Sequence, residues 1–147
     1  MTHLIVSARD FNEARRKIRE NKGKELVFTS DDDELARKVL EKEPIDVLLI
    51  NHGRRKDKLK QRNSGFNQVL AKLAKKKNVA IGINLDEILK AGNEEKAEIL
   101  ARVRQNIRLC NKNKLKMKFI PDEGKSQYDL KALGLVLGMP TGMTKNL

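Results

Sequence analysis

The chain has 147 residues, 39% of them hydrophobic and 35% charged, with a net charge of +12 at pH 7. We expect residues 1–147 to form a single domain, because this length suffices for one sizeable core and the blocks of Leu, Ile and Val exclude intrinsic disorder. The longest apolar run covers only residues 45–50. A membrane span needs roughly 18 apolar residues, so none is expected.

Short apolar runs alternate with segments of helical periodicity along the whole chain. The runs predict five strands, at residues 3–8, 25–29, 45–50, 79–83 and 116–120. The periodic segments predict helices that begin at or beside Asp10, Ser30, Phe66, Asp86, Glu94 and Asp129. The buried face of the third helix is expected to consist of Phe66, Val69, Leu70 and Leu73. The tail after Met139 is expected to fray.

Strands that alternate with helices indicate repeated βα units, which require a parallel sheet with right-handed crossovers. The predicted strands are apolar throughout, as in strands that are covered on both faces or line a barrel. Five strands are too few for a complete eight-stranded barrel. The sequence therefore predicts an α/β fold with an open or partial barrel.

One segment carries most of the net charge. Between residues 54 and 77, ten basic residues stand against a single acid, Asp57. Charge concentrated in this way is typical of proteins that bind polyphosphates, because each neutralised phosphate releases counterions. The residues predicted to contact RNA or DNA are Arg54, Arg55, Lys56, Lys58, Lys60, Arg62, Lys72, Lys75, Lys76 and Lys77. The three arginines are expected to contribute most, because a guanidinium group binds phosphate through two hydrogen bonds.

A second basic segment supports the same interpretation. Residues 99–121 contain no acid and seven basic residues: Arg102, Arg104, Arg108, Lys112, Lys114, Lys116 and Lys118. Aromatic residues make up 3% of the chain, which argues against a surface that stacks single-stranded bases on exposed rings. Contacts with phosphates are therefore expected to dominate.

Signs of enzymatic chemistry are weak. A small metal-dependent phosphoesterase would have to use His52, Asn84 and Asp86, which follow the third and fourth predicted strands. The acids at residues 31–34 are better explained as helix caps than as a metal site. Cys110 is the single cysteine and lies on an apolar helical stripe, so a buried thiol in a reducing, cytoplasmic protein is expected. The familiar phosphate-binding loops are missing.

Two stretches carry a resemblance to a known family. Residues 65–85 (GFNQVLAKLAKKKNVAIGINL), preceded by Arg55-Lys56-Asp57, resemble the core of ribonuclease P protein component 3, the archaeal counterpart of the thirty-kilodalton eukaryotic subunit. Residues 128–138 (YDLKALGLVLG), followed by Met139-Pro140, are similar to the family's closing motif. The order and spacing of the two stretches also fit the family.

The resemblance implies a barrel-like fold related to the polymerase-and-histidinol-phosphatase (PHP) barrel, without that group's metal ligands. It implies a non-catalytic, RNA-binding subunit of ribonuclease P, in which the RNA cleaves the 5′ leader from precursor tRNA. The implied partners are the ribonuclease P RNA and protein component 2 directly, and precursor tRNA indirectly. The chain itself is expected to bind no cofactor, because the magnesium requirement belongs to the RNA.

Relative to the family pattern, the chain lacks the first two βα units and the C-terminal extension, and residues 121–124 replace a small-residue turn. We therefore expect a truncated TIM-like, PHP-like barrel whose open sheet edges are covered by RNA or by a partner protein. A metal-dependent phosphoesterase and a general structured-RNA-binding module remain the alternatives.

Overall fold

A parallel β-sheet runs through the centre of the computed structural model, which describes residues 4–53, 55–57, 62–145 and 147. The strands are β1 (Leu4–Val6), β2 (Leu26–Thr29), β3 (Val47–Ile50), β4 (Ala80–Asn84) and β5 (Met117–Ile120). Each strand pairs in parallel with the next one along the chain, in the order β1-β2-β3-β4-β5. This sequential order is that of consecutive βα units in a barrel, and it confirms the α/β fold with a parallel sheet.

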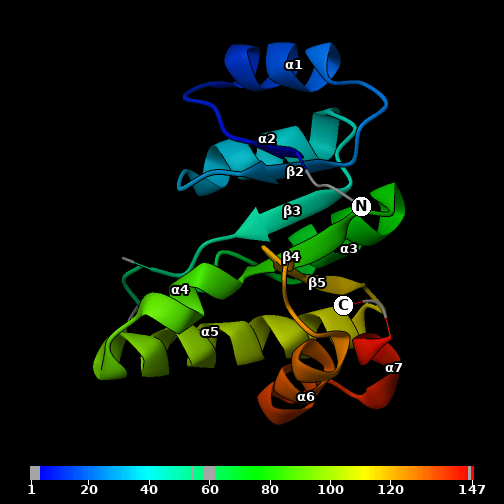
Figure 1. The fold of residues 1–147 in the computed structure, drawn as a ribbon. Helices are drawn as coiled ribbons and strands as arrows, with labels where there is room; N and C mark the ends of the chain where they lie inside the picture. Colours follow the sequence, from blue (N-terminus) through cyan, green and yellow to red (C-terminus); the bar gives the residue numbers. More distant parts are fainter. Residues whose placement is uncertain (1–3, 54, 58–61, 146) are drawn as a thin grey trace.

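The helices pack against one face of the sheet (Figure 1). They are α1 (Phe11–Glu20), α2 (Asp33–Lys42), α3 (Gln68–Lys77), α4 (Leu85–Lys90), α5 (Asn93–Lys112), α6 (Gln127–Leu137) and α7 (Thr141–Thr144). Polar side chains cap several of these helices by accepting hydrogen bonds from backbone N–H groups of the first turn. Asp10 accepts from Glu13 N at 2.8 Å, and Asn67 accepts from Leu70 N at 2.9 Å. None of the helices in the described ranges is long and apolar enough to cross a membrane.

The two faces of the sheet are packed differently. Alternate strand residues such as Phe28, Ile81 and Phe119 join the helices in one large core. The residues between them face the other way and form a small second cluster of Val27, Val47, Leu49 and Ile120. A Cβ at Gly82 on this second face would lie 3.0 Å from a methyl group of Leu49, so the side chains there are tightly packed.

One ion pair shows that the sheet is curved. Lys118 Nζ on β5 lies 3.1 Å from Glu25 Oε1, directly before β2. Neighbouring strands are spaced about 4.8 Å apart, so in a flat sheet β2 and β5 would be separated by about 14 Å. Since these two side chains meet, the sheet curls toward the face that carries Val27 and Leu49. The described chain is therefore part of a barrel rather than a flat sheet.

The structure corrects two predictions about local structure. The helix at residues 66–77 begins at Gln68, and it buries Leu70, Ala71 and Ala74, while Val69 is 63% exposed. The alanines can approach the sheet closely, so the buried face is rotated from the one expected. The tail does not fray after Met139, because α7 follows it and buries Met143.

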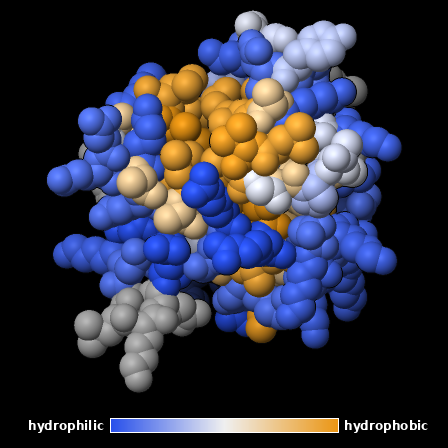
Figure 2. Space-filling model, turned by 90° about the horizontal axis from the view of Figure 1, so that it is seen from below, coloured by the Kyte–Doolittle hydropathy of each residue, from blue (hydrophilic) through white to orange (hydrophobic). Residues whose placement is uncertain are grey.

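An apolar patch ringed by hydrophilic residues lies on the side of the molecule on which α6 and α7 lie (Figure 2). Helix α6 buries Leu130 and Leu137 against the core, yet it also exposes Tyr128, Leu135 and Val136, the last of these by 72%. The exposed residues recur at helical spacing and form a second apolar stripe on the outer side of α6. A helix that is apolar on both sides is normally covered by another element.

Candidate nucleic-acid interface

The predicted basic loop, residues 51–65, lies between β3 and α3, and a buried arginine holds it. Arg102 on α5 is 3% exposed and donates hydrogen bonds to the backbone carbonyls of His52 and Arg55, both at 2.9 Å. Its Nη2 also lies 3.3 Å from Asp57 Oδ1. The buried Arg102 therefore stabilises the loop from inside the protein. This corrects the prediction that Arg102 belongs to an exposed basic segment.

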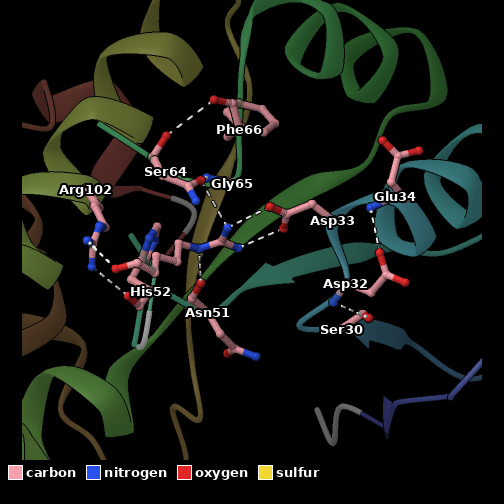
Figure 3. A network of polar contacts seen from close by, with 12 residues as sticks. Ser30, Asp32, Asp33, Glu34, Asn51, His52, Ser64, Gly65, Phe66 and Arg102 are labelled. Carbon is pink, nitrogen blue, oxygen red and sulfur yellow. Dashed lines mark hydrogen bonds and ion pairs between the residues drawn. The ribbon is translucent and has the colours of Figure 1, made fainter. Parts of the chain in front are cut away.

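A second arginine closes the loop against α2. The Arg55 guanidinium binds both oxygens of Asp33, at 2.8 and 2.9 Å, and its Nε donates to the carbonyl of Asn51 (Figure 3). Its side chain is 10% exposed. Two parallel hydrogen bonds of this kind are among the strongest polar contacts in proteins. Arg55 was predicted to contact RNA. In the structure its guanidinium binds Asp33 and the backbone of the loop.

Three further side chains hold the loop. The Glu87 carboxylate on α4 accepts the backbone N–H groups of His52 and Gly53, at 2.7 and 2.8 Å. Farther along the loop, Asn106 Nδ2 on α5 donates to the carbonyl of Ser64 at 3.0 Å, and Gln105 Nε2 donates to the Ser64 hydroxyl at the same distance. Much of the loop is thus tied to α4 and α5 by specific hydrogen bonds.

Gly65 shows how closely the loop packs. Its φ is +71°, in the left-handed region, and a Cβ at this position would collide with the Arg55 guanidinium. A residue with a side chain is therefore disfavoured here by both backbone strain and space. This explains why glycine begins the GFNQVLAKL stretch.

His52 is a buried residue and not a reactive one. It is 2% exposed, and its Nδ1 has no hydrogen-bond partner among the described residues. Burial, with the nearby Arg55 and Arg102 guanidinium groups, lowers the pKa of His52 to about 3. The imidazole is therefore neutral at physiological pH and inaccessible to RNA or to a substrate.

Of the other groups of the phosphoesterase alternative, Asn84 makes structural contacts, and Asp86 lies in the first turn of α4. Asn84 caps α4 by accepting from Glu87 N at 3.3 Å, and its Nδ2 donates to Asn51 Oδ1 at 2.9 Å. Asn51 in turn donates to the Thr29 hydroxyl at 3.0 Å. Within the described ranges, no group of three or more His, Cys, Asp or Glu side chains is arranged to hold a metal ion. The geometry gives no support to metal-dependent hydrolysis.

The predicted helix caps and the buried thiol agree with the structure. Asp32 caps α2 by accepting from Glu34 N and Leu35 N. The Ser30 hydroxyl, where the helix was expected to start, instead accepts from Asp32 N at 3.0 Å (Figure 3). Cys110 is fully buried, and burial raises its pKa to about 12.

The predicted RNA-binding residues do not form one surface. Arg54, Lys58 and Lys60 lie outside the described residues. Lys56 and Arg62 are exposed on the loop that leaves the carboxyl end of β3. Lys75, Lys76 and Lys77 belong to the last turn of α3, which leads through Asn78 into the amino end of β4. The sheet therefore separates the loop from these lysines, with Lys72 exposed between them on α3.

At the amino end of the sheet the two basic segments meet. Lys75 Nζ donates to the carbonyl of Lys114 at 3.1 Å, across from α3 to the residues after α5. Residues of both segments line a hollow of about 220 Å³ at this place. Its full lining is Glu25, Asp46, Lys75, Asn78, Val79, Ala80, Lys114, Leu115, Lys116 and Lys118. The structure thus brings together lysines that are about forty residues apart in the sequence.

The side chains that hold the loop in place were not predicted from the sequence. The sequence did contain a signal for two of them. Ile99, Val103 and Ile107 are buried on α5, and Arg102 and Asn106 lie at the same helical spacing. A polar residue within an apolar stripe indicates a buried hydrogen-bonded group. Glu87 and Asp33 had no such signal, because their partners are backbone groups and a side chain from distant parts of the chain.

Comparison with known proteins agrees with this fold. The profile of the family described as RNase P subunit p30 matches residues 4–146. "Ribonuclease P protein component 3" of Methanococcus maripaludis strain C7 is 26% identical over 144 residues, which are 97% of this chain and 59% of that protein. The protein of the same name from Methanosarcina mazei is 31% identical over 107 residues, 73% of this chain and 41% of the relative.

A solved structure has the same fold. One chain of a cryo-EM structure of archaeal ribonuclease P with mature tRNA superposes with a TM-score of 0.76 at 22% identity, covering 98% of this chain and 62% of that chain. The present chain spans about three fifths of the length of the Methanococcus maripaludis relative and of the solved chain. From the match over nearly its whole length, we conclude that the chain belongs to the RNase P subunit p30 family.

Proposed function

We propose that this chain is a non-catalytic, RNA-binding protein subunit of ribonuclease P that supports removal of the 5′ leader from precursor tRNA. Membership of the RNase P subunit p30 family is the observation that carries this proposal. The net charge of +12 and the exposed lysines and arginines support it, since they suit a phosphate backbone. A general RNA-binding module would have the same charges, and the experiment below separates the two.

The proposed mechanism is electrostatic. Exposed basic residues neutralise phosphates where RNA helices approach one another, so that the folded RNA needs fewer magnesium ions. Of the residues predicted from the sequence, the exposed candidates among the described ones are Lys56, Arg62, Lys72, Lys75 and Lys76. In this proposal the chain binds no metal itself, and magnesium remains with the RNA.

We also infer that the apolar outer stripe of α6 is where protein component 2 docks. Surfaces that bind RNA are polar and positively charged, whereas the centre of a protein interface is apolar. Leu135 is 50% exposed and Val136 is 72% exposed on α6, which fits a protein partner and not RNA. A second copy of this chain is a poorer occupant, because two chains of charge +12 repel each other. The proposed partners are thus ribonuclease P RNA, component 2 and, indirectly, precursor tRNA, in the cytoplasm.

The proposal is tested by reconstituting precursor-tRNA cleavage from the ribonuclease P RNA and component 2, with and without this chain. We expect the chain to increase the rate of leader removal. A variant with Lys75→Glu and Lys76→Glu, two exposed lysines at the end of α3, is expected to lose much of this increase. The matched control is Lys90→Glu with Lys125→Glu, two exposed lysines outside both basic segments.

The control variant is expected to behave as the wild type. If the wild-type chain binds many unrelated RNAs equally well and leaves leader removal unchanged, the chain is a general RNA-binding module and the proposal is rejected.

A further inference from the structure

We propose that the amino end of the parallel sheet is a binding surface for the phosphate backbone of RNA, formed chiefly by Lys75, Lys114 and Lys116. This inference rests on the proposed RNA-binding function and moves its main contact away from the loop. We call this region the amino-end lysine surface. It also includes Lys76, Lys77, Lys112 and Lys118.

The surface is assembled by the fold from two distant segments. Asn78, which follows α3, has a φ of +55°, and Lys114, the second residue after α5, has a φ of +57°. Both residues are in the left-handed conformation, which reverses the chain after each helix. The reversals bring the ends of α3 and α5 to the same hollow, where Lys75 contacts the Lys114 carbonyl at 3.1 Å.

The charge at this end of the sheet is unbalanced. Four lysines line the hollow, against the carboxylates of Glu25 and Asp46, and Lys76, Lys77 and Lys112 belong to the same surface. The carboxyl-terminal ends of α3 and α5 contribute about half a negative charge each, so the hollow alone keeps an excess of about one positive charge, to which the three neighbouring lysines add. This excess remains after the helix dipoles are considered, so it is available to an external anion.

The carboxylates in the hollow are already engaged. Asp46 Oδ2 accepts the backbone N–H of Leu26 at 2.8 Å, and Glu25 Oε1 pairs with Lys118. By contrast, Lys75, Lys114 and Lys116 are exposed and form no ion pair with any described residue. Lys75 uses one of its three N–H donors on the Lys114 carbonyl, which orients the ammonium group at the hollow.

The loop at the opposite end of the sheet is less suited to phosphate. Among its described residues, Arg55 is paired with Asp33, and Asp57 lies beside Arg102. Gly53 lies next to the carboxylate of Glu87. Asp33, Asp57 and Glu87 offset three of the four basic residues there, which are Arg55, Lys56, Arg62 and Arg102. Among the described residues, the amino end of the sheet therefore offers more uncompensated positive charge than the loop.

The ligand that fits this surface is an RNA backbone and not a single small anion. The lysines of the hollow come from α3, from the residues that lead into β5 and from β5 itself. Lysines spread over such an area match successive phosphates of an RNA helix, which carries charge along its whole length. The surface contains no aromatic residue for stacking, so we expect little dependence on base sequence.

The test is a salt titration of RNA binding by Lys114→Gln with Lys116→Gln, compared with Lys90→Gln with Lys125→Gln. Labelled ribonuclease P RNA and labelled precursor tRNA are measured separately, to distinguish which RNA occupies the surface. Loss of two phosphate contacts should reduce the slope of log K against log salt by about 1.4–1.8, and should weaken binding about 20-fold at 0.15 M salt. The control variant should change neither value.

Each outcome decides the inference. A reduced slope with either RNA supports it and identifies that RNA as the ligand. If the wild type binds RNA and the lysine variant keeps the same slope with both RNAs, the amino-end surface is rejected while the proposed function stands. If the wild type binds neither RNA, the proposed function fails and this inference fails with it. Circular dichroism of each variant confirms that it is folded.

Discussion

Arg102 Nη1 donates a hydrogen bond to the carbonyl oxygen of His52, fifty residues earlier in the chain, at 2.9 Å. The bond joins the long helix α5 to the first residues after β3, and both residues are buried. One of the most basic parts of the sequence thus contains an arginine whose charge is used inside the protein. Charge counting alone therefore overstates what residues 54–62 and 99–121 offer to RNA.

Replacement of Arg102 by Met should destabilise the protein by about 2–4 kcal/mol, because buried carbonyl oxygens of His52 and Arg55 lose their donor. Urea unfolding measures the change. Arg104→Met is the matched control, since Arg104 lies on the same helix and is exposed, and it should change the free energy of unfolding by less than about 0.5 kcal/mol. Equal effects of the two substitutions would contradict the structural role of Arg102.

Gly65→Ala should destabilise the protein more than Gly124→Ala does. Both glycines have a positive φ, +71° and +72°, so both substitutions carry a backbone cost of about 1–2 kcal/mol. Only at Gly65 does the added Cβ also collide with a side chain, that of Arg55. The excess cost should shrink in an Arg55→Ala background, which a double-mutant cycle measures. An excess that persists without Arg55 would show that the collision is not its cause.

Stability should depend on the protonation of His52. The pKa of its imidazole is lowered from 6.5 to about 3, so between these values the unfolded chain binds a proton that the native protein does not. The free energy of unfolding therefore falls as the pH decreases below 6.5, by up to about 1.4 kcal/mol per pH unit from this residue. This contribution to the pH dependence fades above pH 6.5 and is nearly absent by about pH 7.5, because the unfolded chain then no longer binds the proton.

Urea unfolding at pH 7.5, 6.5 and 5.5 checks this, with His52→Gln as the comparison. Between pH 6.5 and 5.5 the free energy of unfolding should decrease less for the variant than for the wild type, whatever the variant's absolute stability. The ring protons of His52 should also keep constant NMR shifts from pH 7.5 to 5.5. A ring that titrates near pH 6.5 would contradict the buried, neutral imidazole.

Val136→Glu should reduce capture of component 2 at least tenfold, because it places a charge in the centre of the apolar stripe on α6. The fold should be unaffected, since Val136 is 72% exposed. Val69→Glu is the matched control, because Val69 is 63% exposed on α3, and it should leave the affinity unchanged. Calorimetry measures the affinity for component 2. If the affinity falls equally for both variants, or for neither, α6 is rejected as the docking face.

Strand and helix order could be predicted because apolar runs and helical spacing are local. Every strand lies within or beside its predicted range, and Asp10 caps α1 as expected. The site was harder to predict, because its contacts join residues distant in the sequence, such as Asp33 with Arg55. The same reason explains the division of the basic residues, since Lys75 and Lys77 follow Arg62 closely in the sequence but lie at the other end of the sheet.

The most direct measurement is the magnesium dependence of single-turnover cleavage of precursor tRNA by the ribonuclease P RNA and component 2, with and without this chain. The account predicts that the chain lowers the magnesium concentration needed for half-maximal rate, and that the chain without the RNA cleaves nothing. An unchanged magnesium requirement in the presence of the folded chain, or cleavage by the chain alone, would contradict its role as a non-catalytic RNA-binding subunit.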